Sequence, residues 1–173
     1  MKVSNRTFII ILSFVASSAA VAISMKKPEV KTEESTEEHD LQKVESLVEN
    51  FFTGLENKDT TALKDIMTMG GTFYASMENR PIFKSTHRGW MVNLVSNNSK
   101  LKERYWNKDI KIHKGIATVW TDYDFYIDGK LSHCGKNVMN LIKQKEEWKL
   151  ADAYFTIEKD CAESPLGPYF EEQ

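Results

Sequence analysis

The chain is poor in the residues that mark several common protein classes. Its 173 residues include only two cysteines, four prolines and eight glycines, and its formal net charge is −2. Two distant cysteines do not make a zinc site, and the lack of a basic cluster argues against nucleic acid as a partner. The sequence has no phosphate-binding loop and no Gly-x-Ser-x-Gly motif, which excludes the nucleotide hydrolases and α/β-hydrolases that depend on them. We therefore expect one domain that uses no metal and no cofactor.

The N-terminus has the pattern of a targeting segment. Lys2 and Arg6 precede an apolar run that begins at Phe8, and the small residues Ala-Val-Ala end at Ala22. This pattern predicts a signal peptide over residues 1–22 and export to the periplasm or the extracellular space. The alternative is an uncleaved anchor, because the uncharged stretch is nearly long enough to span a bilayer. Contact with a membrane is expected only in that second case.

Composition divides the rest of the chain into three parts. Residues 23–40 are charged and lack an apolar period, which is typical of a disordered spacer. Residues 162–173 contain prolines and a glycine and few core residues, which predicts a flexible tail. Residues 41–161 carry regular apolar periods and are the predicted domain.

Helix and strand periods over residues 41–161 predict an α+β fold. Asp59 or Thr60 is expected to cap the second helix, and Ser85 or Thr86 the third. The expected helices are 41–55, 61–67 and 87–95, and the expected strands are 72–76, 101–111, 116–127, 131–143 and 148–157. Such an order predicts three N-terminal helices packed in the concave face of a strongly curved antiparallel sheet, with an open mouth at one end.

The strongest local signal is Asp128-Gly129, which stands between two runs rich in β-branched and aromatic residues. Asp-Gly in this setting predicts a β-hairpin with a two-residue turn. Such a turn places Ile127 opposite Lys130 and, counting outward, Asp124 opposite His133. Facing residues have Cβ atoms roughly 5 Å apart, so we expect Asp124 and His133 to form a hydrogen-bonded pair.

Strand alternation assigns the other side chains to one face or the other. A second turn at Lys145-Glu146 places Trp148 and Leu150 on the same face as His133, where they join Met139 and Leu141. This apolar cluster identifies the face expected to pack on the helices. The site candidates expected on that face are Trp120, Asp122, Asp124, Tyr126, His133, Asn137, Asp152 and Tyr154.

The opposite face would be an exposed apolar patch, unusual for a monomer. Its predicted members are Val119, Tyr123, Phe125, Ile127 and Val138. Because aromatic residues are enriched at interfaces, the patch predicts a homodimer packed sheet to sheet. The alternative is that the C-terminal tail folds back and covers the patch within one chain.

The residue pattern resembles the nuclear transport factor 2-like superfamily, in particular its SnoaL-like exported bacterial branch. The segments that carry the resemblance are Phe51-Phe-Thr-Gly-Leu55, Lys58-Asp-Thr-Thr-Ala-Leu63, Gly115-Ile-Ala-Thr-Val-Trp120, Tyr123-Asp-Phe-Tyr-Ile-Asp-Gly-Lys130, Ser132-His-Cys-Gly135 and Trp148-Lys-Leu150. The resemblance implies a cystatin-like cone fold. It does not imply one activity, because the superfamily includes isomerases, cyclases, dehydratases and many non-enzymes.

Two functions follow from the predicted cone. The leading hypothesis is an exported protein that binds a small apolar or amphipathic molecule, since the interior is apolar with few polar groups at its mouth. Its predicted ligand-binding residues are Tyr74, Trp120, Tyr126, Asn137, Asp152 and Tyr154. The alternative is an isomerase, cyclase or dehydratase in which Asp124, His133 or Asp122 transfers a proton, because a buried or paired acid can have the necessary pKa.

The two cysteines, Cys134 and Cys161, belong to the part expected to be exported, where disulfides persist. Strand parity puts Cys134 opposite a residue near Ile157, which favours two unpaired cysteines. The segment after the last strand could instead fold back and bring the Cα atoms within the ~7 Å that a disulfide needs. Both alternatives remain open at this point.

Overall fold

The computed structural model describes residues 33–169. The predicted signal peptide, most of the predicted spacer and residues 170–173 lie outside the described residues. The elements are α1 (Glu33–Asn57), α2 (Thr60–Ile66), β1 (Met67–Met77), β2 (Phe83–Thr86), α3 (His87–Ser96), β3 (Leu101–His113), β4 (Ile116–Ile127), β5 (Lys130–Gln144) and β6 (Glu147–Ile157). Among the helices described, none is long and apolar enough to cross a membrane.

The strands form one open, curved sheet in the order β2-β1-β6-β5-β4-β3. Strands β3 to β6 make the expected antiparallel meander. The prediction of a purely antiparallel sheet is wrong in one respect, because β1 runs parallel to β6, with Tyr74 beside Tyr154. Strand β2 pairs with β1 in a region expected to be a loop or a ragged strand. The sheet is therefore mixed.

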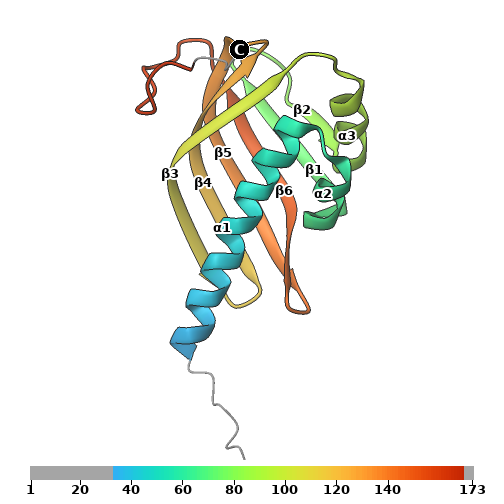
Figure 1. Cartoon of the computed structure of the whole chain (residues 1–173), viewed down its shortest axis with the longest axis vertical. Helices are drawn as coiled ribbons and strands as arrows, with labels where there is room; N and C mark the ends of the chain where they lie inside the picture. The colour runs from blue at the N-terminus through green and yellow to red at the C-terminus, as the bar shows by residue number, and fades with distance from the viewer. Residues whose placement is uncertain (1–32, 170–173) are drawn as a thin grey trace, which may run out of the picture. The chain divides into compact units, whose positions relative to one another are not determined.

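The helices pack on the concave face of the sheet (Figure 1). Asp59 caps α2 and Thr86 caps α3, as the sequence predicts. The predicted apolar stripe of α1 is buried apart from Leu41, which is half exposed; its buried members are Val44, Leu47, Val48, Phe51, Phe52 and Leu55. Burial of this stripe against the sheet is the main stabilising contribution to a fold of this kind.

Helix α1 begins at Glu33, earlier than its apolar stripe predicts. Buried Asp40 explains part of the extension. Its carboxylate accepts hydrogen bonds from Lys143 Nζ at 2.8 Å and from Trp148 Nε1 at 3.2 Å. Both donors lie on the β5–β6 hairpin, so a residue expected in a disordered spacer anchors the helix to the sheet.

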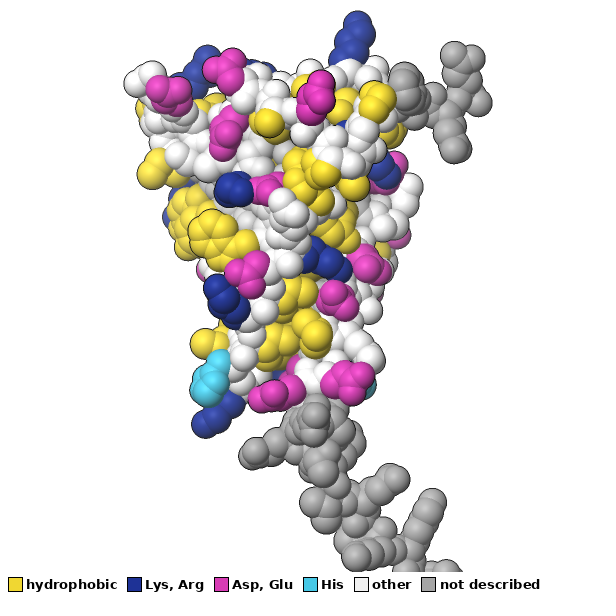
Figure 2. Space-filling model, turned by 90° about the vertical axis from the view of Figure 1, so that its left-hand side faces the viewer, with side chains coloured by type: hydrophobic (Ala, Val, Ile, Leu, Met, Phe, Trp, Pro, Cys, Tyr) yellow, Lys and Arg dark blue, Asp and Glu magenta, His cyan; other side chains and the backbone are white. Residues whose placement is uncertain are grey.

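The edge of the domain at β3 is held to α1 by ion pairs. Lys102 pairs with Glu56 at 2.6 Å and Lys108 with Glu45 at 3.0 Å. Acidic, basic and hydrophobic side chains are interspersed over this side of the domain (Figure 2). Such exposed pairs stabilise a fold only slightly.

Both predicted turns are confirmed, since Ile127 faces Lys130 and Leu141 faces Leu150. Among the irregularities of the sheet, two β-bulges change the predicted faces of the strands around the site. One lies at Ser132, so that Tyr126 faces Leu131 but Phe125 faces His133. The second lies at Ala151 in β6. A bulge adds one residue to one strand and therefore reverses the face of everything beyond it.

Because of these bulges, several side chains lie on the face opposite to the predicted one. His133, Asn137, Met139, Trp148 and Leu150 do lie on the concave face. In β4, however, the concave residues are Val119, Tyr123 and Phe125, so the apolar patch predicted to be exposed is largely core. The residues predicted to be inside that lie on or toward the convex face are Trp120, Asp122, Asp124, Tyr126 and Tyr154.

The C-terminal segment folds back onto the convex face. Cys134 and Cys161 form a disulfide with a Cα–Cα distance of 5.8 Å. Strand parity favoured unpaired cysteines, but Cys134 faces Glu158, after which the chain turns back. Gly167 O then accepts a hydrogen bond from Arg104 Nη1 at 2.9 Å. The tail therefore covers part of the convex face. A tail that folds back within one chain was the predicted alternative to the dimer. The residues that it covers, however, differ from those of the predicted apolar patch.

Candidate functional site

A cavity of about 190 Å³ lies between the helices and the concave face of the sheet. Most of its walls are aromatic or aliphatic, with polar groups on β3, β4 and β5. The lining residues are Phe51, Leu55, Phe73, Trp90, Leu94, Leu101, Glu103, Tyr123, Phe125, His133, Asn137, Met139, Ala153, Phe155 and Ile157. An apolar pocket with a few convergent polar groups is the usual form of a small-molecule site.

Glu103 is the acid in this cavity. Its Oε1 accepts a hydrogen bond from Asn137 Nδ2 at 2.8 Å. Burial among apolar walls raises the pKa of Glu103 to about 7, the nearby charge of Asp124 acts in the same direction, and the Asn137 bond opposes them. Near neutral pH this carboxyl group can therefore accept a proton or donate one.

His133 is the second ionisable group on the cavity wall. Its ring stacks on Phe125 with centroids 4.9 Å apart and meets the ring of Tyr123 edge-on at 5.7 Å. Its Nδ1 lies 3.1 Å from Ser132 Oγ. Burial lowers the pKa of His133 to about 4, with a further contribution from the charge of Lys159. The imidazole is therefore neutral at physiological pH and can donate or accept a hydrogen bond.

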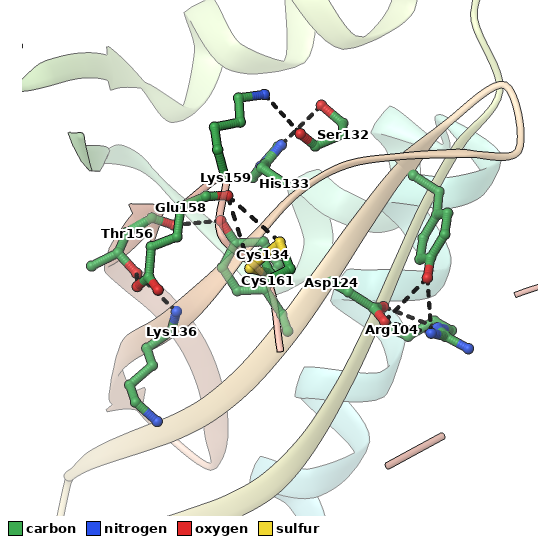
Figure 3. Close-up of a disulfide and its surroundings, with 12 residues drawn as sticks. Arg104, Asp124, Ser132, His133, Cys134, Lys136, Thr156, Glu158, Lys159 and Cys161 are labelled. Carbon is green, nitrogen blue, oxygen red and sulfur yellow. Dashed lines mark hydrogen bonds and ion pairs between the residues drawn. A yellow bond between two sulfur atoms is a disulfide. The ribbon is translucent and has the colours of Figure 1, made fainter. Parts of the chain in front are cut away.

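The predicted Asp124–His133 pair is wrong, because the Ser132 bulge sends the two side chains to opposite faces of the sheet. Asp124 forms a bidentate ion pair with Arg104, one bond of which joins Nε and Oδ1 at 2.9 Å. Tyr126 OH accepts a hydrogen bond from Arg104 Nη2 at 3.0 Å. Figure 3 shows Asp124 bonded to Arg104, and His133 bonded to Ser132 instead.

Asp122, the other predicted acid, also lies outside the cavity. It forms an ion pair with Lys136 and accepts a hydrogen bond from Asn107 Nδ2 at 2.7 Å. These two bonds lower the pKa of Asp122 below its ordinary value. The raised pKa expected of a buried catalytic acid is therefore found at Glu103 and not at Asp122.

Of the six predicted ligand-binding residues, Asn137 lines the cavity. Tyr74 and Tyr154 stack on each other on the convex face, with ring centroids 5.0 Å apart. Trp120 is also on that face and is 47% exposed. Tyr126 lies under the tail, 4.7 Å from the ring of Tyr169. Asp152 Oδ1 accepts a hydrogen bond from the backbone N–H of Thr72 at 2.8 Å, next to the irregular part of β1.

Glu103 is not among the residues predicted for the site, although the sequence carries a signal for it. Leu101, Glu103 and Tyr105 alternate along β3, and Leu101 and Tyr105 contact the core. An acid between two inward apolar positions of one strand indicates a buried carboxyl group. No group of metal-binding side chains occurs among residues 33–169 that could hold an ion.

The chain resembles solved structures in fold. No family model matches it, and no curated protein matches it. A nuclear transport factor 2-like protein with a cystatin-like fold from Novosphingobium aromaticivorans has a TM-score of 0.62 at 9% identity, covering 80% of this chain and 94% of that one. A protein of unknown function from Mycobacterium tuberculosis has a TM-score of 0.60 at 12% identity, with 80% and 81% coverage.

A third structure carries a functional suggestion in its name. It is a nuclear transport factor 2-like protein from Streptomyces avermitilis for which dehydratase activity has been suggested. Its TM-score is 0.57 at 12% identity, and the match covers 70% of this chain and 97% of that one. Identities this low show the fold and leave the activity open. Together with the helices on a curved, open sheet, these matches show that the chain has a cystatin-like fold, as these nuclear transport factor 2-like proteins do.

Proposed function

We propose that this protein binds a small, largely apolar molecule in the concave cavity, and that Glu103, Asn137 and His133 hold the polar group of that molecule. The observation that carries the proposal is the carboxyl group of Glu103 inside a largely apolar cavity. Burial of a carboxyl group with a single hydrogen-bond partner costs free energy. Groups with pKa values shifted by burial concentrate at functional sites.

Filling the cavity should remove binding. Ala153 is buried and lines the cavity, so Ala153→Leu places extra methyl groups in the space proposed for the ligand. We expect compounds that raise the melting temperature of the wild type, from a screen of lipids, steroids and aromatic metabolites, to leave this variant unchanged. Overpacking can also cost about 1–3 kcal/mol, so the comparison is of the ligand-induced shift rather than of the melting temperature itself.

Ala162→Leu is the matched control, since Ala162 is exposed on the tail. It should keep the ligand-induced shift of the wild type. An equal shift in wild type and Ala153→Leu would place binding elsewhere and contradict the proposal.

A second candidate function is proton transfer, of the isomerase, cyclase or dehydratase type. It is favoured by the pKa of Glu103, about 7, because a general base is most effective when its pKa is near the working pH. In this version Glu103 moves the proton, and neutral His133 donates a hydrogen bond to the oxygen that gains charge. Incorporation of solvent deuterium into the bound compound distinguishes this function from binding alone.

We also propose export, as the N-terminal pattern predicts. The Cys134–Cys161 disulfide supports it, because such bonds persist in oxidising compartments and are rare in the cytosol.

We further propose a homodimer through the convex face, with residues that replace the predicted patch. Neighbouring strands place a row of side chains directly across the sheet. In order from β2 to β3, the row is Lys84, Tyr74, Tyr154, Val138, Trp120 and Asp109. Its middle is apolar and aromatic, and its ends carry opposite charges. A twofold axis through the middle would bring Lys84 to Asp109 of the partner subunit, which is the self-complementarity that a twofold interface requires.

A charge at the centre of this row should dissociate the dimer. Trp120 is 47% exposed, so Trp120→Glu changes the outer surface and leaves the core intact. We expect the wild type to sediment as a dimer at micromolar concentration, and Trp120→Glu as a monomer with a similar melting temperature, because an unpaired charge at an interface is strongly unfavourable. Val92→Glu on the exposed side of α3 should remain dimeric. A monomeric wild type would contradict the proposal.

A further inference from the structure

We propose that the cavity ligand is an uncharged molecule about the size of one six-membered ring that carries one hydroxyl group, such as a phenol or a benzylic alcohol. This inference rests on the proposed function and narrows it to a class of ligand. It is carried by the volume of the cavity, the aromatic side chains around it and the hydrogen bonds available at Glu103.

The size of the ligand follows from the volume. The cavity measures about 190 Å³. An apolar cavity of about 150 Å³ accommodates benzene, whereas pockets for drug-sized ligands occupy roughly 300–1,000 Å³. The space therefore suits one ring with one or two further heavy atoms. A molecule with four fused rings would extend out of this space.

The shape of the ligand follows from the aromatic walls. Trp90 stacks on Phe51 with ring centroids 5.8 Å apart and lies 4.9 Å from the ring of Phe73. Phe125 and Phe155 reach the same cavity from the sheet. These rings come from α1, α3 and the strands, so they surround the space from both layers of the fold. Flat aromatic surfaces pack well on another ring, in stacked or edge-on geometry.

The polar group follows from the hydrogen bonds of Glu103. Among the described residues, the bond donated by Asn137 is the one hydrogen bond that the carboxyl group makes, which leaves its other oxygen for a ligand. A hydroxyl group can donate to a carboxylate and accept from a carboxylic acid, so it suits this group in either protonation state. A carbonyl suits only the protonated state and an ammonium only the ionised one. A ligand anion would be desolvated beside an acid, which is unfavourable.

The test is isothermal titration calorimetry with the full chain at pH 7. The probes are phenol and benzyl alcohol, toluene as a partner of similar shape without the hydroxyl, benzoate as the anion, and testosterone as the larger ligand. We expect phenol or benzyl alcohol to bind about tenfold more tightly than toluene, the usual effect of one buried hydrogen bond. Benzoate and testosterone should not bind.

Variants separate recognition of the hydroxyl from binding in the cavity. Glu103→Leu should remove the difference in affinity between phenol and toluene, while toluene still binds. Ala153→Leu should abolish the binding of both compounds. If phenol and toluene bind the wild type equally, recognition of the hydroxyl is overturned while the cavity remains the site. If testosterone binds and phenol does not, the ligand class is wrong and the proposed function stands. If no probe or screened compound binds, the proposed ligand class and the proposed function are both wrong.

Discussion

Glu103→Gln is expected to stabilise the domain at alkaline pH and to remove a pH dependence that the wild type has. The pKa of Glu103 is raised from 4.5 to about 7 in the folded state. Between these values the folded chain keeps a proton that the unfolded chain has lost. The contribution of Glu103 to the free energy of unfolding is therefore complete below pH 4.5 and is lost as the pH rises through 7. One pKa unit corresponds to about 1.4 kcal/mol, so the full effect is about 3 kcal/mol.

The measurement is urea unfolding of both proteins from pH 5 to pH 8. His133 acts in the opposite direction, because its pKa is lowered from 6.5 to about 4 and its contribution is lost as the pH falls through that range. The variant minus wild-type difference cancels His133 and isolates Glu103. This difference should grow by roughly 3 kcal/mol toward pH 8. A flat difference for Glu103→Gln would show that its carboxyl group is hydrated.

Loss of the disulfide is expected to destabilise the domain by a similar amount. Cys134 and Cys161 are separated by 27 positions in the sequence. The chain entropy that a cross-link of this span removes from the unfolded state corresponds to about 3.5 kcal/mol. The double variant Cys134→Ser with Cys161→Ser should lose about this much in urea unfolding at pH 7.

Reduction of the wild type with a dithiol should give the same loss, since each disulfide takes up two electrons and two protons to become two thiols. The double variant should not respond to the dithiol. A variant as stable as the oxidised wild type would mean that the backbone bonds between Cys134 and Glu158 hold this segment by themselves.

Local signals account for the parts of the fold that the sequence predicts correctly. Asp128-Gly129 and Lys145-Glu146 specify turns, and the apolar stripe from Val44 to Leu55 specifies α1. The parallel pairing of β1 with β6 joins segments about eighty residues apart. It depends on tertiary packing, for which neither segment carries a local pattern.

The candidate site is harder to predict, because it depends on which face of the sheet each side chain occupies, and one extra residue in a strand reverses that assignment. His133 and Asn137 were placed on the correct face, since they lie on β5 beyond the bulge together with Met139 and Leu141. Asp124 lies on the face opposite to the predicted one, because a residue count from the turn does not include the extra residue at Ser132 in β5. Bulges have weak sequence signatures, and a single one is enough to move a proposed catalytic acid from the cavity to the opposite surface.

The side chains of His133 and Cys134 make the inner and outer surfaces of β5 depend on each other. His133 points into the cavity and Cys134 reaches outward to the tail, because neighbouring residues of a strand point to opposite faces. A one-residue shift of β5 against its neighbouring strands would exchange the two directions, and it would remove a cavity wall and separate the sulfur atoms in a single event. A descendant of this chain could therefore not change the register of β5 without losing both the disulfide and the binding site, so insertions or deletions that shift this strand should be rarer than substitutions in it.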